Sequence, residues 1–229
     1  MELSTLQTNT NYRRRDATDS FVSSDEITVY LNEGLRTING DGNYEFTKTS
    51  SAFVYTDGSV QYKLSAVAPD NKFPIDMFYS DDHEFEMIAP EDFRKISESG
   101  LNIYAIDNAD LLAKTSFGSG TIEYHYYSTY MAQTSGGSWI AALSTSTDTP
   151  LVPERWQDML VDFAAARCYQ KEGMIDDYTI AYSDFRRKLD QMRMEYPSKR
   201  RRVIKRWKSS KEVGLRGPGT VMKGNPLGQ

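Results

Sequence analysis

Few residues of this chain have the type and spacing that catalysis or metal binding requires. His83 and His125 are the two histidines, and neither has a second histidine or a cysteine at ligand spacing. We therefore expect both to be polar surface residues on strands. Cys168 is the single cysteine, which excludes an internal disulfide, and with no histidine near it we expect a small buried helix residue instead of a nucleophile.

Glycine and acidic motifs give no cofactor site either. The stretch SFGSGT, residues 116–121, lacks the lysine of a phosphate-binding loop and reads as a hairpin turn. Asp81-Asp82 fits a turn and Asp176-Asp177 fits the start of a helix, and no calcium-loop pattern occurs. The sequence therefore predicts no catalytic, metal or cofactor site, and a protein that is not an enzyme.

Charge is the feature that remains, and it is divided along the chain. The net charge is −5, but residues 197–229 hold ten Lys or Arg and one acid, a net of +9. The preceding 196 residues then hold seventeen basic and thirty-one acidic residues, a net of −14. Such segregation indicates an electrostatic division of roles within one molecule.

The basic segment interleaves cations with apolar anchors, and its candidate docking residues are Lys199, Arg200, Arg201, Arg202, Val203, Ile204, Lys205, Arg206, Trp207, Lys208 and Lys211. By itself this pattern fits nuclear import, RNA, DNA and anionic membranes equally well. A dedicated DNA binder usually spreads positive charge over a folded face, whereas the body here is acidic. Because the Gly- and Pro-containing end cannot fold alone, we expect this arm to lie across a protein partner.

Helical patterns occupy both ends of the body. Ser23 and Glu26 have capping-box spacing before a stripe of apolar residues, and Asn39-Gly40 marks the expected stop. A shorter helix should begin near Ser4, with Leu3, Leu6 and Tyr12 facing inward. Residues 151–173 predict a helix that begins at Pro153 and stops at Gly173, followed at 175–196 by one with Ala181, Phe185, Leu189 and Met192 inward. These two helices should lie antiparallel.

The middle of the chain has the two-residue period of strands, from Tyr44 to about Met131. Asp57-Gly58 predicts a tight hairpin between the runs on either side of it. A short helix is expected in APEDFRKISES, residues 89–99, and residues 132–150 predict an exposed loop that carries Trp139 and Ile140. Met174, Met192 and Met194 have helical spacing and are expected to fill the core.

The predicted fold class is α+β: a four-helix bundle with an inserted antiparallel β-rich region and an extended basic C-terminal arm. The predicted division is a discontinuous helical bundle of residues 1–40 and 150–196, a β-rich insertion of residues 41–149, and the arm of residues 197–229. No run of eighteen apolar residues and no signal-peptide pattern occurs, so neither a membrane span nor secretion is expected.

Three stretches and their order resemble a known family. They are FVSSDEITVYLNEGLRTIN, the β-rich region that ends in IEYHYYSTY, and TPLVPERWQDMLVDFAAARCYQKEG followed by an acidic-start helix. Together, over roughly residues 3 to 196, they resemble the head-tail connector (adaptor) proteins of tailed bacteriophages, including the tubular adaptor of short-tailed phages. The order of residue types over residues 151–169 is the most characteristic part of this resemblance.

The resemblance implies a virion protein assembled in the host cytoplasm, in which a helical core packs side by side into a twelvefold ring of identical copies. It implies a portal protein above the ring, a tail or nozzle protein below it, and a C-terminal arm that docks on the portal. Genomic DNA would pass through the lumen without specific binding, which suits an acidic body because carboxylates repel phosphates. The alternative is a nucleic-acid-binding accessory protein that places its basic arm on phosphates.

Overall fold

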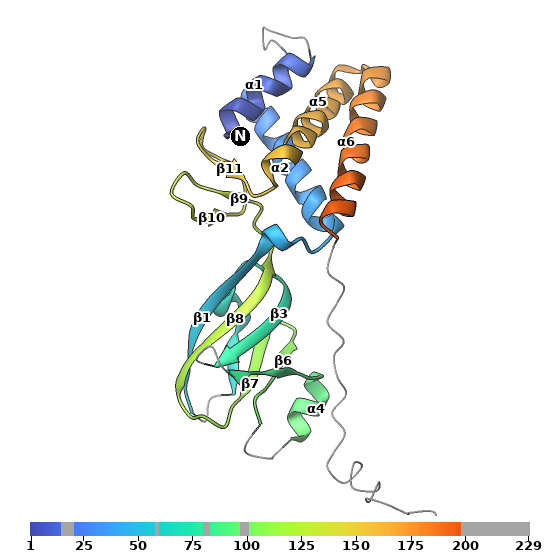
Figure 1. The fold of residues 1–229 in the computed structure, drawn as a ribbon. Coiled ribbons are helices and arrows are strands. Elements are labelled where there is room, and N and C mark those ends of the chain that lie inside the picture. The colour runs from blue at the N-terminus through green and yellow to red at the C-terminus, as the bar shows by residue number, and fades with distance from the viewer. Residues whose placement is uncertain (15–20, 58–59, 80–82, 97–100, 198–229) are drawn as a thin grey trace, which may run out of the picture.

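The computed structural model describes residues 1–14, 21–57, 60–79, 83–96 and 101–197. It has a helical part at one end and a β part at the other, joined by short connections (Figure 1). The long helices of the helical part are α1 (Leu3–Arg14), α2 (Ser24–Asp41), α5 (Asp158–Glu172) and α6 (Ile175–Glu195).

Helix α2 begins and is buried as its sequence predicts. The Glu26 amide donates to Ser23 Oγ at 3.2 Å, and the Ser23 amide donates to Glu26 Oε2 at 3.0 Å, which completes the capping box. The apolar stripe Ile27, Leu31, Leu35 and Ile38 is buried in the helical core. The helix continues to Asp41, one residue beyond the predicted stop at Asn39-Gly40.

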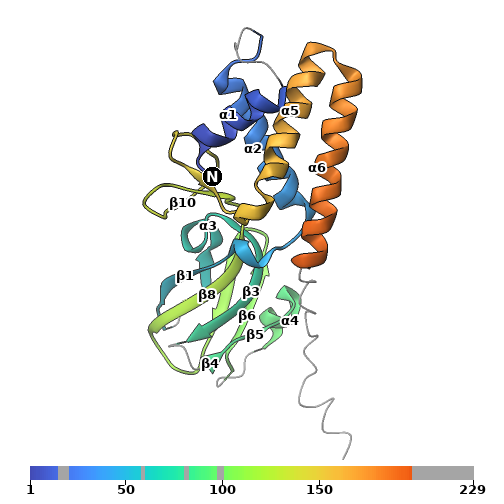
Figure 2. The same cartoon turned by 45° about the horizontal axis from the view of Figure 1, so that its top comes forward.

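Helix α5 is the centre of the helical part, since α1, α2 and α6 all pack against it. It ends at Gly173, whose φ of 76° lies in the left-handed region that favours glycine. The buried Ala165 and Ala166 pack against Ala181, so α6 lies close along α5 (Figure 2). On the other side, a Cβ at Gly34 of α2 would lie 3.2 Å from Phe163 Cδ1.

The β part contains two four-stranded sheets. The first has the order β1-β8-β3-β4 and the second β2-β7-β6-β5. Their bounds are β1 (Lys48–Tyr55), β2 (Gln61–Lys63), β3 (Asn71–Tyr79), β4 (His83–Glu84), β5 (Glu86–Met87), β6 (Ile103–Asp107), β7 (Asp110–Lys114) and β8 (Gly120–Ser128). Fully buried rings of Tyr104, Tyr124 and Phe85 contribute to the core of this part, so these two tyrosines have a structural role.

Two short α-helices also belong to the β part, α3 (Leu64–Val67) and α4 (Pro90–Lys95). Helix α4 forms where APEDFRKISES predicts it, with Pro90 in its first turn. Its buried Phe93 joins Ile88, Ile96 and Ile103 in a separate cluster.

The predicted exposed loop of residues 132–150 forms a third sheet, with β10 (Trp139–Ile140) and β11 (Thr149–Pro150) on either side of β9 (Ala132–Gln133). Polar contacts hold this segment. Asn32 of α2 donates to the Leu143 carbonyl at 3.0 Å and accepts from its amide at 2.8 Å. The buried Asp148 accepts from the Ser144 and Thr145 amides at 2.8 and 2.7 Å.

The prediction of a four-helix bundle is therefore wrong. The described residues form a mixed α+β fold with six α-helices and three sheets, completed by the short 3-10 helices η1 (Glu45–Thr47) and η2 (Glu154–Trp156). The long helices gather around α5, and Ala132 of β9 joins their core cluster. The inserted β region fits the prediction in part, and the domain boundaries at residues 41, 150 and 197 remain a prediction.

Both predicted hairpins are also wrong. Strand β1 pairs with β8 and β2 pairs with β7, so the turn that contains Asp57 joins two different sheets; Gly58 lies outside the described residues. The SFGSGT stretch likewise connects β7 to β8, which do not pair with each other. The β part is not wholly antiparallel, because β5 and β6 run parallel. Local turn residues predict a reversal of the chain but not which strand becomes the partner.

Three residues that we expected in the core are exposed instead. Tyr12, Met174 and Met194 are 76%, 45% and 79% exposed, whereas Leu3, Leu6 and Met192 are buried as predicted. Helix α1 packs against α5 and α2, and α6 packs against α5, so side chains on the other faces of these helices and at the turn before α6 remain in solvent.

Candidate functional site

The predicted arm residues Lys199 to Lys211 lie outside the described residues, which end at Pro197. The structure does describe the base of the arm, by which we mean the last turn of α6 and the groups that contact it. This base lies where the helical part meets the β part (Figure 2).

Aromatic and charged groups hold the last described residues of α6. The Tyr196 ring packs edge-on against Phe46 at 5.9 Å between centroids, and the Arg155 guanidinium lies 5.6 Å from the centre of the Tyr196 ring. Trp156 Nε1 donates to Glu195 Oε2 at 3.0 Å, and Arg155 forms an ion pair with the same carboxylate. The chain therefore leaves α6 from a defined position beside η1.

A partly buried ion pair lies one turn before this point. Arg193 Nε donates to Asp41 Oδ2 at 2.6 Å, a second Arg193 nitrogen contacts the other carboxylate oxygen, and the Tyr44 hydroxyl also donates to Asp41. Burial alone would raise the pKa of Asp41, but the hydrogen bonds from Arg193 and Tyr44 outweigh it, so the pKa lies below its usual value. Burial and the Asp41 charge raise the pKa of Tyr44. The pair is therefore charged at neutral pH.

Lys72 of β3 completes the junction from the β part. Its ammonium donates to Asn39 Oδ1 at 2.9 Å and to the Gly42 carbonyl at 2.5 Å, and it also contacts the Asn39 carbonyl. These groups lie at the carboxyl end of α2, where a cation is favoured by the helix dipole. Burial lowers the pKa of Lys72 while Asp41 acts in the opposite direction. The arm base, α2 and β3 thus share one polar junction.

The candidates for chemistry are placed apart from this junction and from each other. His83 is exposed on β4 and stacks on Phe117, whereas His125 on β8 is half-buried, with Nδ1 2.5 Å from Asp76 and Nε2 3.1 Å from Glu123. Cys168 is buried on α5 as predicted. Among the described residues, no three or more His, Cys, Asp or Glu side chains gather as a metal site would require.

The acid pairs have different outcomes. Asp176 and Asp177 lie in the first turn of α6, as predicted. Asp81-Asp82 lies outside the described residues.

The sequence did not single out Asp41, Lys72 or Tyr196 as functional residues, because their partners are distant in the chain. The one local signal was the position of Asp41 beside the expected helix stop.

A protein-family comparison decides the affiliation of the chain. The model of the SU10 adaptor protein family matches residues 1–212. The chain belongs to this family. The match includes the basic residues Lys199 to Lys211 of the arm, and it confirms the resemblance to phage head-tail adaptors. A search of curated proteins gives no match.

Family membership makes this SU10-type adaptor a bacteriophage adaptor and a structural component of the virion. The narrower comparison with the tubular adaptor of short-tailed phages stays a prediction. Across the described part of this adaptor, no helix combines the length and apolar character needed to span a membrane.

Proposed function

We propose that the protein forms a homo-oligomeric ring, twelvefold as the family resemblance implies, that joins the portal to the tail and continues the DNA channel. The C-terminal arm docks on the portal through its basic and apolar residues, and the protein has no enzymatic activity. The family match over residues 1–212 carries this proposal. The charge segregation supports it, because an arm of net +9 on an acidic body is suited to an acidic groove of a partner.

The arm base supplies a further argument for the docking role. Tyr196, Arg193 and Glu195 tie the last turn of α6 to α2, η1 and η2, so force on the arm passes into the folded body. The rigid start of the arm also reduces the number of residues that must become ordered when the arm binds. Docking of the remaining arm residues then costs less conformational entropy.

Cosedimentation with purified portal rings tests the arm. We expect the full chain to bind stoichiometrically, and a chain that ends at Tyr196 to lose at least about a hundredfold in affinity because one of its contacts with the portal is gone. A chain that ends at Glu212 keeps every basic residue named above and serves as the matched control. Equal portal binding by the full chain and by the chain ending at Tyr196 would refute the docking role.

The alternative, a nucleic-acid-binding accessory protein, is favoured by the ten basic residues among residues 197–229. Duplex DNA binding measured across a salt series separates the two functions. For a channel protein, we expect the chain ending at Tyr196 to show no tight binding at physiological salt, because its net charge is −14. Tight binding by this body would contradict the repulsive channel wall. Strong arm-dependent DNA binding without portal binding would favour the accessory protein.

A further inference from the structure

Strand β1 forms an open edge of the first sheet (Figure 1). On one side it pairs with β8 along its whole length, from Lys48 opposite Tyr127 to Tyr55 opposite Gly120. On the other side, no strand of the described chain pairs with it. Because alternate residues of an edge strand point their N–H and C=O groups away from the sheet, β1 presents a row of backbone donors and acceptors to its surroundings.

The other edges of the two four-stranded sheets are short or carry features that block pairing. Strands β2, β4 and β5 have only two or three residues each. The part of β3 that is not paired with β4 contains Pro74, which has no N–H to donate, and its register against β8 shifts twice. The eight residues of β1 include no proline, and their register is continuous. A long and regular edge of this kind indicates a partner strand.

The inner side of β1 is also left partly open. Thr49, Ser51 and Phe53 face the second sheet, where the Phe53 ring lies 5.0 Å from that of Tyr62, yet all three are only half-buried. Their neighbours on β8 with the same orientation are buried, as Tyr124 shows. On the outer side of β1, Val54 is 70% exposed. An additional strand beside β1 would cover residues of both rows.

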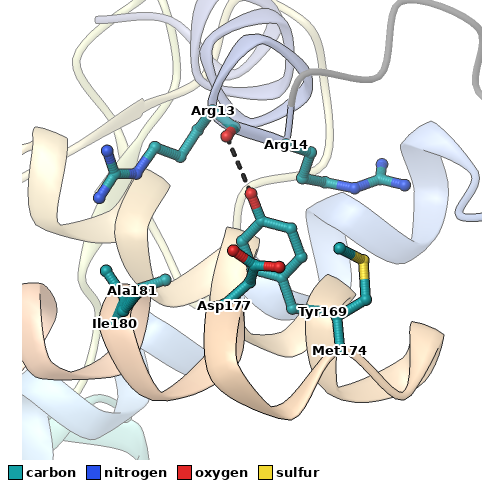
Figure 3. Close-up of a pocket in the computed structure, with 7 residues that line it drawn as sticks. All are labelled: Arg13, Arg14, Tyr169, Met174, Asp177, Ile180 and Ala181. Atoms are coloured by element: carbon teal, nitrogen blue, oxygen red, sulfur yellow. Dashed lines mark hydrogen bonds between the residues drawn. The ribbon is translucent and has the colours of Figure 1, made fainter.

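A second open feature, a hollow of about 320 Å³ between α1, α5 and α6, favours no single class of partner (Figure 3). Arg13, Arg14 and Asp177 line it. Arg13 pairs with Asp184 at 2.7 Å and Arg14 pairs with Glu172, so both arginines already have counter-charges. The edge of β1 is more selective, because alternating backbone donors and acceptors fit another extended strand.

A second β1 is well suited to fill this edge. Within the described chain, β1 is the longest strand edge that nothing blocks, so it alone offers a match over its own length. Antiparallel pairing around Ser51 places Lys48 opposite Val54 and Thr49 opposite Phe53. The alkyl stem of Lys48 then covers the exposed Val54. Lys48 is the single charged residue of β1, so no like charges meet in this register.

We propose that two copies of this chain pair through their β1 strands, antiparallel and around a twofold axis at Ser51. The two four-stranded first sheets then form one continuous sheet across the contact. A contact that uses the same surface on both copies closes with two molecules and does not by itself generate a cyclic ring. The pairing is therefore a property of the free chain, distinct from the ring contacts of the proposed function, and it covers the open edge before assembly.

Substitutions at Val54 test the register in the full chain without any partner protein. Val54→Lys should raise the dissociation constant of the dimer about tenfold, because twofold symmetry repeats the like-charge contact with Lys48. Val54→Glu should lower it about threefold, because the new carboxylate faces Lys48. Thr121→Lys adds the same charge at an exposed position of β8, one strand away from the edge, and should leave the dissociation constant unchanged. Sedimentation equilibrium over a series of protein concentrations measures all four chains.

An engineered disulfide tests the twofold axis itself. Directly opposed residues of antiparallel strands have Cα atoms about 4.5–5.5 Å apart, which a disulfide can bridge. Ser51→Cys should therefore form a covalent dimer under mild oxidation, seen on non-reducing gels. Thr121→Cys is the matched control and should remain monomeric on the same gels. The native Cys168 is buried, so the wild-type chain should give no covalent dimer.

The outcomes decide the inference independently of portal binding. A wild-type chain that sediments as a monomer at every concentration would overturn it. Self-association that responds equally to Val54→Lys and Val54→Glu, or no covalent dimer of Ser51→Cys, would show that another surface joins the copies. Opposite effects of the two Val54 substitutions together with the Ser51→Cys cross-link would establish the β1 contact, whatever the portal experiments give. Circular dichroism confirms that each variant is folded.

Discussion

Replacing Phe185 with alanine should lower the free energy of unfolding by about 3–5 kcal/mol, the cost of a large cavity in a packed core. The Phe185 side chain is fully buried and its ring packs edge-on against Phe163 at a centroid distance of 5.0 Å. It is one of the main contacts that hold α6 on α5. Urea denaturation followed by far-ultraviolet circular dichroism measures the change.

Met194 provides the matched control for this prediction. It lies on the same helix but is 79% exposed, so Met194→Ala should change the free energy of unfolding by less than about 0.5 kcal/mol. A loss below about 1 kcal/mol for Phe185→Ala, or equal losses for the two variants, would contradict the packing of α6 described above. Because the arm follows α6, unfolded molecules of the Phe185→Ala variant should not bind the portal. The portal-bound fraction should therefore fall by the fraction that is unfolded.

Replacing Asp41 with alanine should lower the free energy of unfolding by about 2–3 kcal/mol at pH 7, since the hydrogen bonds of a charged group are lost and the buried Tyr44 hydroxyl loses its acceptor. Arg193 is partly exposed and can turn to solvent, which keeps the loss below that of a fully buried pair. A double-mutant cycle with Arg193→Met measures the coupling. Independent, additive effects of the two substitutions would contradict the ion pair.

The pH dependence of stability should report the same pair. The pKa of Asp41 is lower in the folded protein than in the unfolded chain, so the folded state holds fewer protons there. Its stabilising contribution is present above the unfolded value and is lost as the pH falls through the folded value. Urea denaturation at pH 7 and at pH 3 should therefore show a smaller loss on acidification for Asp41→Ala than for the wild type. An equal loss for both would show that Asp41 is not stabilised by Arg193.

Several elements were predictable because their signals are local. The capping box of Ser23 and Glu26, the stop at Gly173 and the inward stripe of α6 each depend on residues within a few turns of one another. The charge segregation and the pattern of residues 151–169 can also be read from the sequence. The family match agrees with the resemblance to phage adaptors that this pattern indicated. The candidate docking residues of the arm remain a prediction from the same local pattern.

The bundle and the hairpins were wrongly predicted, and the short strands within residues 132–150 were not predicted, because each depends on a distant partner. Strand β1 pairs with β8, more than sixty residues away, and the Asp57 turn contains nothing that selects this partner. Residues 132–150 are held by Asn32, which is 111 residues from its partner Leu143. Polar side chains that bind a remote backbone leave no hydrophobic period in the sequence, so such a segment reads as an exposed loop.

The sequence by itself determined where the long helices form, which of their faces is apolar, and that a basic arm follows an acidic body. Only the tertiary structure decided that α5 is the centre of the helical part and that Asp41, Lys72 and Arg193 join the arm base to the β part. The physical reason is the range of the interactions: helix signals act over a few residues, whereas ion pairs, sheet partners and surface hollows form between segments that only the folded chain brings together.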